Sequence, residues 1–284
     1  MTIQSTNQLV ALVIFDIDGV IRDVGGSYRR ALADTVEHLT NGAYRPSQSE
    51  IDTLKAEGIW NNDWEASQEF VFRYFEMHEM SILPAVQDTI GRDQAGRGGV
   101  AIAYDKLVAF FQSRYRGTDP NQFTGYICQE PLLVDPEYFD QLTGAKIGWG
   151  FFSGATRKSA SYVLEKRLGL ATPVLVAMED APGKPDPTGL FAAIAQVTPA
   201  SKIPVLYVGD TVADMYTVVK ACQQQGDRPW VAVGILPPHV QETEAQSQAY
   251  ADGLRHAGAA IVFENVQELT PTAIAQLVLQ REEG

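Results

Sequence analysis

Long uninterrupted runs of apolar residues mark the most clearly predicted elements of this chain. The first run, residues 9–15, ends at Asp16-Ile17-Asp18-Gly19 and is typical of a strand buried on both faces of a parallel sheet. Similar runs at 146–152, 174–178 and 203–208 are each followed by a helical pattern, at 157–168, 188–196 and 213–225. Two further strands are expected at 230–235 and 260–263, with helices at 241–257 and 271–280. This alternation predicts an α/β fold with a doubly wound, Rossmann-like parallel sheet.

The segment 24–130 differs, because it contains helical periodicities and no convincing buried strand. Helices are expected at 27–39, 47–57, 65–78 and 103–115, and the glycine-rich stretch 91–99 is expected to be a loop. The stretches 25–26 and 117–120 are candidate flexible junctions at either end. The sequence therefore predicts two domains, an α/β core of residues 1–23 and 131–284 and an inserted all-helical cap of residues 24–130.

Composition and charge narrow the range of partners. The 284 residues include 35 Asp and Glu against 22 Lys and Arg, a formal net charge of −13 at pH 7. This excess disfavours a nucleic-acid partner, and a phosphorylated ligand would need a cation or well-placed donors. Cys128 and Cys222 are isolated, which excludes a disulfide scaffold and a zinc site of ordinary spacing. The sequence contains no signal or membrane-spanning run, so we expect a cytoplasmic protein with no membrane partner, either monomer or homodimer.

Four aspartates follow the predicted strands. Asp16 and Asp18 come after the first strand, while Asp210 and Asp214 come after the strand at 203–208. Ligands of open parallel sheets bind at the carboxyl ends of the strands, so these side chains are expected to converge. Carboxylates gathered in one crevice repel one another unless a cation lies among them, and hard oxygen ligands favour Mg²⁺. A single aspartate at a strand end could equally cap a helix, but two such pairs make that reading unlikely for the set.

Phosphate ligands are suggested by three further positions. Lys184 lies in the rigid sequence Gly183-Lys184-Pro185 after the strand at 174–178. Ser153 and Gly154 follow another strand and precede a helix, where a hydroxyl and free backbone N–H groups bind anions. An ordinary helix cap remains the alternative for Ser153. With Mg²⁺, these groups would supply the positive charge and the donors that a phosphate needs.

These motifs together resemble those of the haloacid dehalogenase-like superfamily, in the subfamily with a helical cap (subfamily IA). The four motifs occur in order and span nearly the whole chain: Asp16-Ile17-Asp18-Gly19-Val20 with Asp23, Ser153, Lys184 in Gly-Lys-Pro-Asp-Pro, and Gly209-Asp210-Thr211-Val212-Ala213-Asp214. The stretch Asn61-Asn62-Asp63-Trp64 is similar to one in a little-characterised branch of the family that is common in cyanobacteria.

The resemblance implies a role for each motif residue. Asp16 would be the nucleophile, and Asp18 would be the general acid and base whose backbone carbonyl also binds Mg²⁺. Ser153 and Lys184 would hold phosphoryl oxygens. Asp210 would be a direct magnesium ligand. Asp214 would belong to the metal site indirectly, by positioning Lys184 or a water bound to the ion. Asp18 also favours phosphoryl transfer, since dehalogenases lack this second aspartate.

Substrate-binding residues are expected beyond these motifs. Asn62, within the Trp60–Trp64 sequence, and Arg29 are candidates from the cap, and Arg157 is a candidate just beyond Ser153. Helix capping by Asn62 and a solvated helix face for Arg29 are the alternatives.

The function expected from the sequence is a Mg²⁺-dependent phosphatase for a small phosphorylated metabolite such as a sugar phosphate or phosphoglycolate. A phosphomutase of the β-phosphoglucomutase type uses the same motifs and is one alternative. A non-catalytic regulatory or binding protein of the same fold is the other. Phosphonate hydrolysis is disfavoured because Lys55, the obvious cap lysine for a Schiff base, shows no sign of unusual burial.

Overall fold

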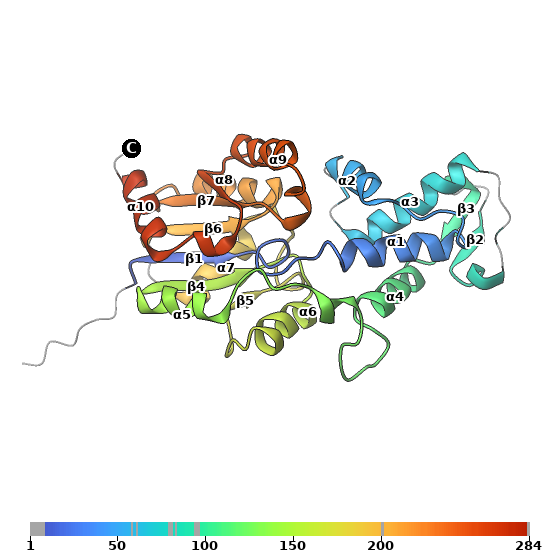
Figure 1. Cartoon of the computed structure of the whole chain (residues 1–284), viewed down its shortest axis with the longest axis horizontal. Helices are drawn as coiled ribbons and strands as arrows, with labels where there is room; N and C mark the ends of the chain where they lie inside the picture. The colour runs from blue at the N-terminus through green and yellow to red at the C-terminus, as the bar shows by residue number, and fades with distance from the viewer. Residues whose placement is uncertain are drawn as a thin grey trace, which may run out of the picture. The chain divides into compact units, whose positions relative to one another are not determined.

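In the computed structural model, the first fold unit is a six-stranded parallel sheet in the order β5-β4-β1-β6-β7-β8 (Figure 1). The structure describes residues 9–57, 59–60, 62–78, 82, 84–93, 97–199 and 202–282. The strands are β1 (Ala11–Phe15), β4 (Ile147–Phe152), β5 (Leu175–Val176), β6 (Val205–Gly209), β7 (Trp230–Ile235) and β8 (Ile261–Phe263). The sequence prediction of a doubly wound parallel sheet is therefore confirmed.

Helices cover both faces of this sheet. They are α5 (Pro136–Gly144), α6 (Arg157–Ser161), α7 (Thr188–Val197), α8 (Val212–Gln224), α9 (Glu244–His256) and α10 (Pro271–Glu282). Short segments complete the unit: the π-helical η4 (Tyr162–Arg167) directly after α6, η5 (Pro238–Val240) and η6 (Val266–Glu268). The sequence pattern did not predict α5, and it joined α6 and η4 into one helix.

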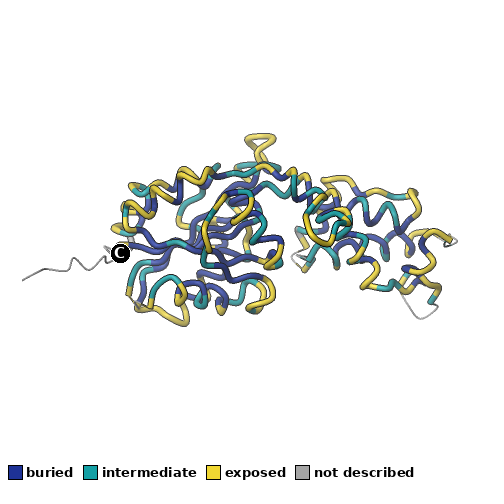
Figure 2. The backbone as a smooth tube through the Cα atoms, turned by 90° about the horizontal axis from the view of Figure 1, so that it is seen from below, coloured by how far each residue is buried: buried dark blue, intermediate teal, exposed yellow. Residues whose placement is uncertain are grey.

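The apolar run of β1 is buried because the strand lies between two hydrophobic cores, one on each face of the sheet. Successive side chains of a strand point to opposite faces, so Ala11, Val13 and Phe15 pack with α5, α6 and α10. Leu12 and Ile14 pack on the other face with α7, α8 and α9. All five residues of β1 are buried, and the strands form the dark interior of the sheet in Figure 2.

The second fold unit, within residues 24–130, is mainly helical. Its helices are α1 (Tyr28–Leu39), α2 (Gln48–Ala56), α3 (Asp63–Met77) and α4 (Tyr104–Tyr115), with short turns η1 (Pro84–Val86), η2 (Arg97–Gly99) and η3 (Tyr126–Gln129). It also contains an antiparallel hairpin of β2 (Ile90–Arg92) and β3 (Val100–Ile102). The expectation of an all-helical insert with a loop over 91–99 was wrong in this detail, because three-residue strands are too short to show a period.

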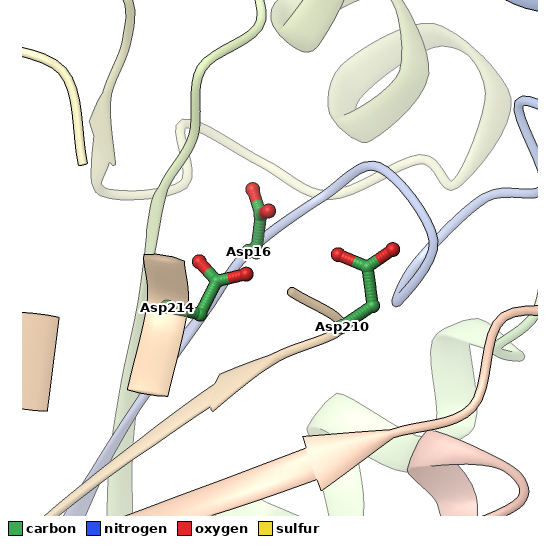
Figure 3. A group of neighbouring side chains, drawn as sticks. All are labelled: Asp16, Asp210 and Asp214. Atoms are coloured by element: carbon green, nitrogen blue, oxygen red, sulfur yellow. The ribbon is translucent and has the colours of Figure 1, made fainter. Parts of the chain in front are cut away.

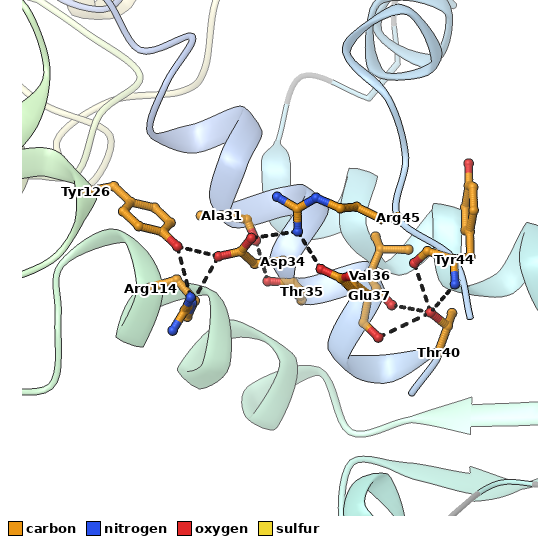
Figure 4. A network of polar contacts seen from close by, with 10 residues as sticks. All are labelled: Ala31, Asp34, Thr35, Val36, Glu37, Thr40, Tyr44, Arg45, Arg114 and Tyr126. Carbon is orange, nitrogen blue, oxygen red and sulfur yellow. Dashed lines mark hydrogen bonds and ion pairs between the residues drawn. The ribbon is translucent and has the colours of Figure 1, made fainter. Parts of the chain in front are cut away.

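A polar network ties the helices of this unit together (Figure 4). The Asp34 carboxylate on α1 accepts hydrogen bonds from the guanidinium groups of Arg45 (2.7 Å) and Arg114 (3.0 Å) and from the hydroxyl of Tyr126 (2.5 Å). Burial opposes ionisation of Asp34, but the bonds from Tyr126, Arg45 and Arg114 outweigh it and lower the pKa of this carboxyl. The network therefore joins α1, α4 and η3 through one ionised side chain.

Contacts between Cα atoms divide the chain into two compact units, residues 1–23 with 131–284 and residues 24–130. We call the first the core unit and the second the helical unit. Among the described residues, every helix is too short or too polar to span a membrane.

Candidate active site

Three of the predicted site residues follow strands that are neighbours in the sheet. β1 pairs with β4 on one side and with β6 on the other, and all three run in parallel. Asp16 therefore follows the central strand, with Ser153 after β4 and Asp210 after β6. Their side chains begin from one edge of the sheet, which is where open α/β sheets bind ligands.

Asp16, Lys184 and Asp214 form a buried ion-pair triad. The Nζ atom of Lys184 lies 2.6 Å from Oδ2 of Asp16 and 2.6 Å from Oδ1 of Asp214. The other oxygen of Asp16, Oδ1, accepts a hydrogen bond from the backbone N–H of Ile17 (2.7 Å). The Asp16 carboxylate is thus held by a partner on each oxygen, and its orientation is fixed.

Asp214 is held by its own helix and by the sheet. It is the third residue of α8, and its carboxylate forms a capping box with Thr211, accepting from the Thr211 N–H (2.9 Å) and hydroxyl (2.6 Å). The hydroxyl of Tyr207, a fully buried residue on β6, lies 3.0 Å from Oδ1 of Asp214. Asp214 is fully buried, and its Oδ1 atom accepts a hydrogen bond from the Lys184 ammonium (2.6 Å).

Burial and mutual repulsion set the protonation behaviour of this site. Burial raises the pKa of Asp16 to about 6; Asp214 and Asp18 add to the rise, whereas Lys184 opposes it. Burial, and then the charges of Asp214 and Asp16, raise the pKa of Asp210 well above its ordinary value. Burial disfavours the charged form of Lys184, but the neighbouring carboxylates Asp16 and Asp214 outweigh it and raise the pKa of this amine.

The carboxylates of Asp16, Asp210 and Asp214 lie close enough to share a metal ion. Each offers an oxygen within 4.8 Å of the others, and Figure 3 shows the three side chains gathered at the ends of their elements. Lys184 pairs with both Asp16 and Asp214, but no described residue donates a hydrogen bond or forms an ion pair to Asp210. All the donor atoms are hard oxygens, so this set fits Mg²⁺.

Gly19 makes room for Asp210. Its φ of +74° lies in the left-handed region, and a Cβ atom there would lie 2.0 Å from Oδ2 of Asp210. Glycine is therefore required both by the backbone conformation and by the carboxylate.

Asp18 has a different environment. The Nε and Nη2 atoms of Arg22 lie 2.7 and 2.6 Å from its Oδ1 atom. The turn between the two residues is closed by a backbone hydrogen bond from Gly19 N–H to the Arg22 carbonyl (2.9 Å). Asp18 is absent from the carboxylate cluster, so only its backbone carbonyl remains as a candidate metal ligand.

Ser153 is buried at the end of β4, and its hydroxyl accepts a hydrogen bond from the N–H of Ala155 (3.1 Å). Gly154 beside it is exposed. The residue that caps α6 is Thr156, so the capping alternative for Ser153 does not hold for this helix.

The remaining substrate-binding candidates have partners within their own units. The Arg157 guanidinium pairs with Asp180 and donates to the Leu175 carbonyl (3.2 Å). Asn62 caps α3 by accepting from the N–H of Trp64 (2.9 Å), as its structural alternative predicted. Arg29 lies 2.5 Å from Asp52. Asn61 of the Trp60–Trp64 sequence lies outside the described residues.

Sequence reasoning missed two residues of this site, Arg22 and Tyr207. Arg22 lies in the loop that carries Asp16 and Asp18, but a single arginine in a loop usually indicates solvent exposure. Tyr207 lies within an apolar strand, where the pattern predicts only core packing. The position of Lys55, paired with Asp63 at 2.8 Å, gives no support to a Schiff-base role.

The chain was also compared with known protein families, sequences and solved structures. Residues 10–221 match the family model of haloacid dehalogenase-like hydrolases. Over 260 residues the chain is 26% identical to an imidazoleglycerol-phosphate dehydratase of Phytophthora nicotianae, covering 89% of this chain and 50% of that protein. The chain thus spans about half the length of the curated relative it matches.

Two solved structures share the fold. A phosphonoacetaldehyde hydrolase-like protein from Oleispira antarctica is similar with a TM-score of 0.65 and 15% identity, covering 100% of this chain and 99% of that chain. Phosphatase Tt82 from Thermococcus thioreducens is similar with a TM-score of 0.59 and 21% identity, covering 84% of this chain and 98% of that chain.

Proposed function

Because the chain belongs to the haloacid dehalogenase-like hydrolase family, we propose that it is a Mg²⁺-dependent phosphatase acting on a small phosphorylated metabolite through an aspartyl-phosphate. The observation that carries this proposal is the Asp16 carboxylate, which is buried, fixed on both oxygens, and paired with Lys184 at 2.6 Å. A fixed and partly neutralised carboxylate is suited to approach a dianionic phosphate.

The first step is phosphoryl transfer to Asp16. A bond forms between a carboxylate oxygen of Asp16 and phosphorus while the bond from phosphorus to the substrate oxygen breaks. Asp18, in its protonated form, gives its proton to the departing alkoxide. Lys184 and the Ser153 hydroxyl bind phosphoryl oxygens, where charge shifts in the transition state.

The second step returns the enzyme to its starting state. A water attacks the phosphorus of the aspartyl-phosphate and gives its proton to Asp18, the bond between Asp16 and phosphorus breaks, and inorganic phosphate leaves. Asp18 is then protonated again for the next turnover. Asp214 and Tyr207 keep Lys184 in place throughout.

Asp16, Asp210 and the backbone carbonyl of Asp18 would hold the Mg²⁺ ion, with Asp214 supporting the site through Lys184. When bound, Mg²⁺ supplies positive charge that offsets the repulsion between phosphate and this acidic site. Asp210 would contribute most directly, since it is the carboxylate of the cluster for which the described part of the chain provides no cationic partner within ion-pair distance.

The helical unit is proposed to act as the cap that selects the substrate. Sugar phosphates and phosphoglycolate are the leading candidates. The name of the Phytophthora nicotianae relative adds imidazole-bearing phosphate esters to the panel.

The test is phosphate release from such a panel with Mg²⁺, measured for the wild type and for Asp16→Asn. The wild type should turn over at least one ester, and Asp16→Asn should lose all detectable turnover while keeping its circular-dichroism spectrum and melting temperature. Turnover retained by Asp16→Asn would contradict the mechanism.

Two other results would favour the alternatives. Conversion of a sugar phosphate that requires a bisphosphate activator would indicate a phosphomutase. Binding of phosphate esters without turnover of any of them would indicate a non-catalytic binding protein.

A further inference from the structure

Arg22 is a fully buried arginine within the loop that follows β1. Its side chain has 0% exposure, and it is the largest of the fully buried side chains among the described residues. Removing a guanidinium from water is costly unless its charge and donors are matched, so a position like this indicates a specific task. One of the groups it contacts is Asp18, four residues earlier in the chain.

The contact is made through one oxygen of Asp18. Both Nε and Nη2 of Arg22 point at Oδ1, at 2.7 and 2.6 Å. Within the described part of the chain, no donor lies on Oδ2 of Asp18. The side chain of Asp18 is 28% exposed, and its two oxygens differ in their partners: Oδ1 accepts from two N–H groups of Arg22, and Oδ2 accepts from none of the described donors.

We propose that Arg22 is a positioning residue that holds Oδ1 of Asp18 and thereby assigns proton transfer to Oδ2. This inference rests on the proposed phosphatase function. A carboxyl group free to rotate would present either oxygen, and its proton would often point away from the leaving group. With Oδ1 held by two N–H donors, the O–H bond that breaks in the first step is at Oδ2, and the departing alkoxide takes that proton.

The need to protonate the leaving group provides a sharp test, because it differs between phosphate esters. An alkyl phosphate leaves as a strongly basic alkoxide and needs the proton of Asp18. The p-nitrophenolate group of p-nitrophenyl phosphate is a weak base and leaves without one. The value of kcat/KM reports the steps up to formation of the aspartyl-phosphate, so release of phosphate from Asp16 does not enter the comparison.

The experiment measures kcat/KM for both esters with Mg²⁺, using the alkyl phosphate that the wild type hydrolyses fastest. Arg22→Met should lower kcat/KM by about 100-fold on the alkyl phosphate, the order that a misplaced catalytic group costs, and by less than about three-fold on p-nitrophenyl phosphate. Asp18→Asn should show the same selective loss. Arg22→Lys should recover part of it, because a lysine restores the charge but only one donor direction.

Arg45→Met is the matched control, since it breaks an aspartate–arginine pair of the helical unit with Asp34. It should leave the ratio of the two kcat/KM values unchanged. If Arg22→Met unfolds, Arg22→Ala with added guanidinium ion provides a second measurement, in which activity should return selectively on the alkyl phosphate.

Each outcome is decisive. Equal losses on both esters in the Arg22 variants would show that Arg22 only supports the fold, and the inference would be wrong while the phosphatase function stands. A wild type that hydrolyses neither ester would overturn the proposed function and this inference with it.

Discussion

Asp16 in the core unit and Asp34 in the helical unit are both surrounded by partners, yet their carboxyl groups shift in opposite directions. Asp34 accepts hydrogen bonds from two arginines and a tyrosine, and its pKa is lowered. Burial raises the pKa of Asp16, the charges of Asp214 and Asp18 add to the rise, and the single ammonium that Asp16 shares with Asp214 does not outweigh them. The excess of cations around Asp34 is typical of a structural ion-pair network, whereas the excess of carboxylates around Asp16 is an arrangement that a bound cation would stabilise.

The same contrast extends across the two units. In the helical unit, burial disfavours ionisation of Glu69, but hydrogen bonds from Arg97 and Arg73 lower its pKa. In the core unit, no arginine or lysine of the described ranges pairs with Asp210, and burial, with the charges of Asp214 and Asp16, raises its pKa well above the ordinary value. Asp34 and Glu69 of the helical unit are thus paired with arginines, whereas Asp210 belongs to a carboxylate cluster that a bound cation would stabilise.

The largest effect is expected when the shared cation of the core unit is removed. Lys184→Met should lower kcat/KM by about 1,000-fold, since an electrostatic partner of the phosphoryl group is lost. It should also lower the free energy of unfolding by about 3 kcal/mol at neutral pH, because two buried carboxylates lose their counter-charge. Urea denaturation without Mg²⁺ measures this loss.

The loss in Lys184→Met should shrink at acidic pH. Burial already raises the pKa of Asp16 to about 6, and without the ammonium a proton becomes its available counter-charge. Equal losses at neutral and acidic pH would show that packing, not charge, accounts for the effect.

The second prediction concerns Mg²⁺ and pH. The pKa of Asp16 rises from 3.8 to about 6 on folding, so the folded protein binds this proton more tightly, and the stability it provides is lost as the pH rises between these values. Mg²⁺ can replace the proton only at higher pH. The ion should therefore stabilise the protein by about 2.7 kcal/mol at a concentration 100 times its Kd near neutral pH, and much less near pH 4.

Thermal melts with and without Mg²⁺ at several pH values measure this difference. The difference between the melting temperatures with and without Mg²⁺ at each pH removes the contribution of surface carboxylates, because these titrate in both samples. Asp210→Asn should remove most of the stabilisation by Mg²⁺. A stabilisation that is independent of pH, or one that Asp210→Asn retains, would place the ion elsewhere.

The smallest effect is expected in the helical unit. Asp34→Asn should lower the free energy of unfolding by about 1–2 kcal/mol, because charge-assisted hydrogen bonds to three partners are weakened. Since the pKa of Asp34 is lowered, this stability is present above its unfolded pKa and is lost as the pH falls through the folded value. Urea denaturation at neutral pH should show this difference between the variant and the wild type, and the difference should decrease as the pH is lowered below the ordinary pKa of an aspartate.

The phosphatase activity of Asp34→Asn provides the comparison with the core unit. Phosphate release per enzyme should remain within about two-fold of the wild type, as for a surface substitution away from a site. A loss of turnover that exceeds the loss of folded protein would mean that the Asp34 network contributes to catalysis.

Much of the core unit could be predicted because each of its longer strands is a run of consecutive apolar residues, a pattern that is visible in the local sequence. The run ending at Asp16 is apolar on both faces, and β7 was predicted with the bounds that the structure has. The motif aspartates could be found because they follow such runs. Of the four aspartates expected to converge, Asp16, Asp210 and Asp214 form a cluster, whereas the Asp18 carboxylate is not part of it and pairs with Arg22.

Other features depend on contacts that no local pattern carries. The role of Tyr207 depends on its hydrogen bond to Asp214, which lies seven residues later on a helix. Within an apolar strand, the sequence pattern of Tyr207 indicates only core packing. The engagement of Arg22 with Asp18 depends on a turn that folds back through a backbone bond at Gly19. The β2–β3 hairpin has too few residues for a period, so only its pairing defines it.

Gly19 also constrains how this enzyme could be diversified. A Cβ atom at position 19 would lie 2.0 Å from the carboxylate of Asp210, so every other amino acid would displace a group proposed to hold the metal. In a saturation library aimed at new substrates, position 19 should therefore be kept as glycine, because its variants are expected to lose activity on every substrate. Randomisation is better directed to residues of the helical unit, where charged side chains such as Asp34 and Arg45 pair with each other.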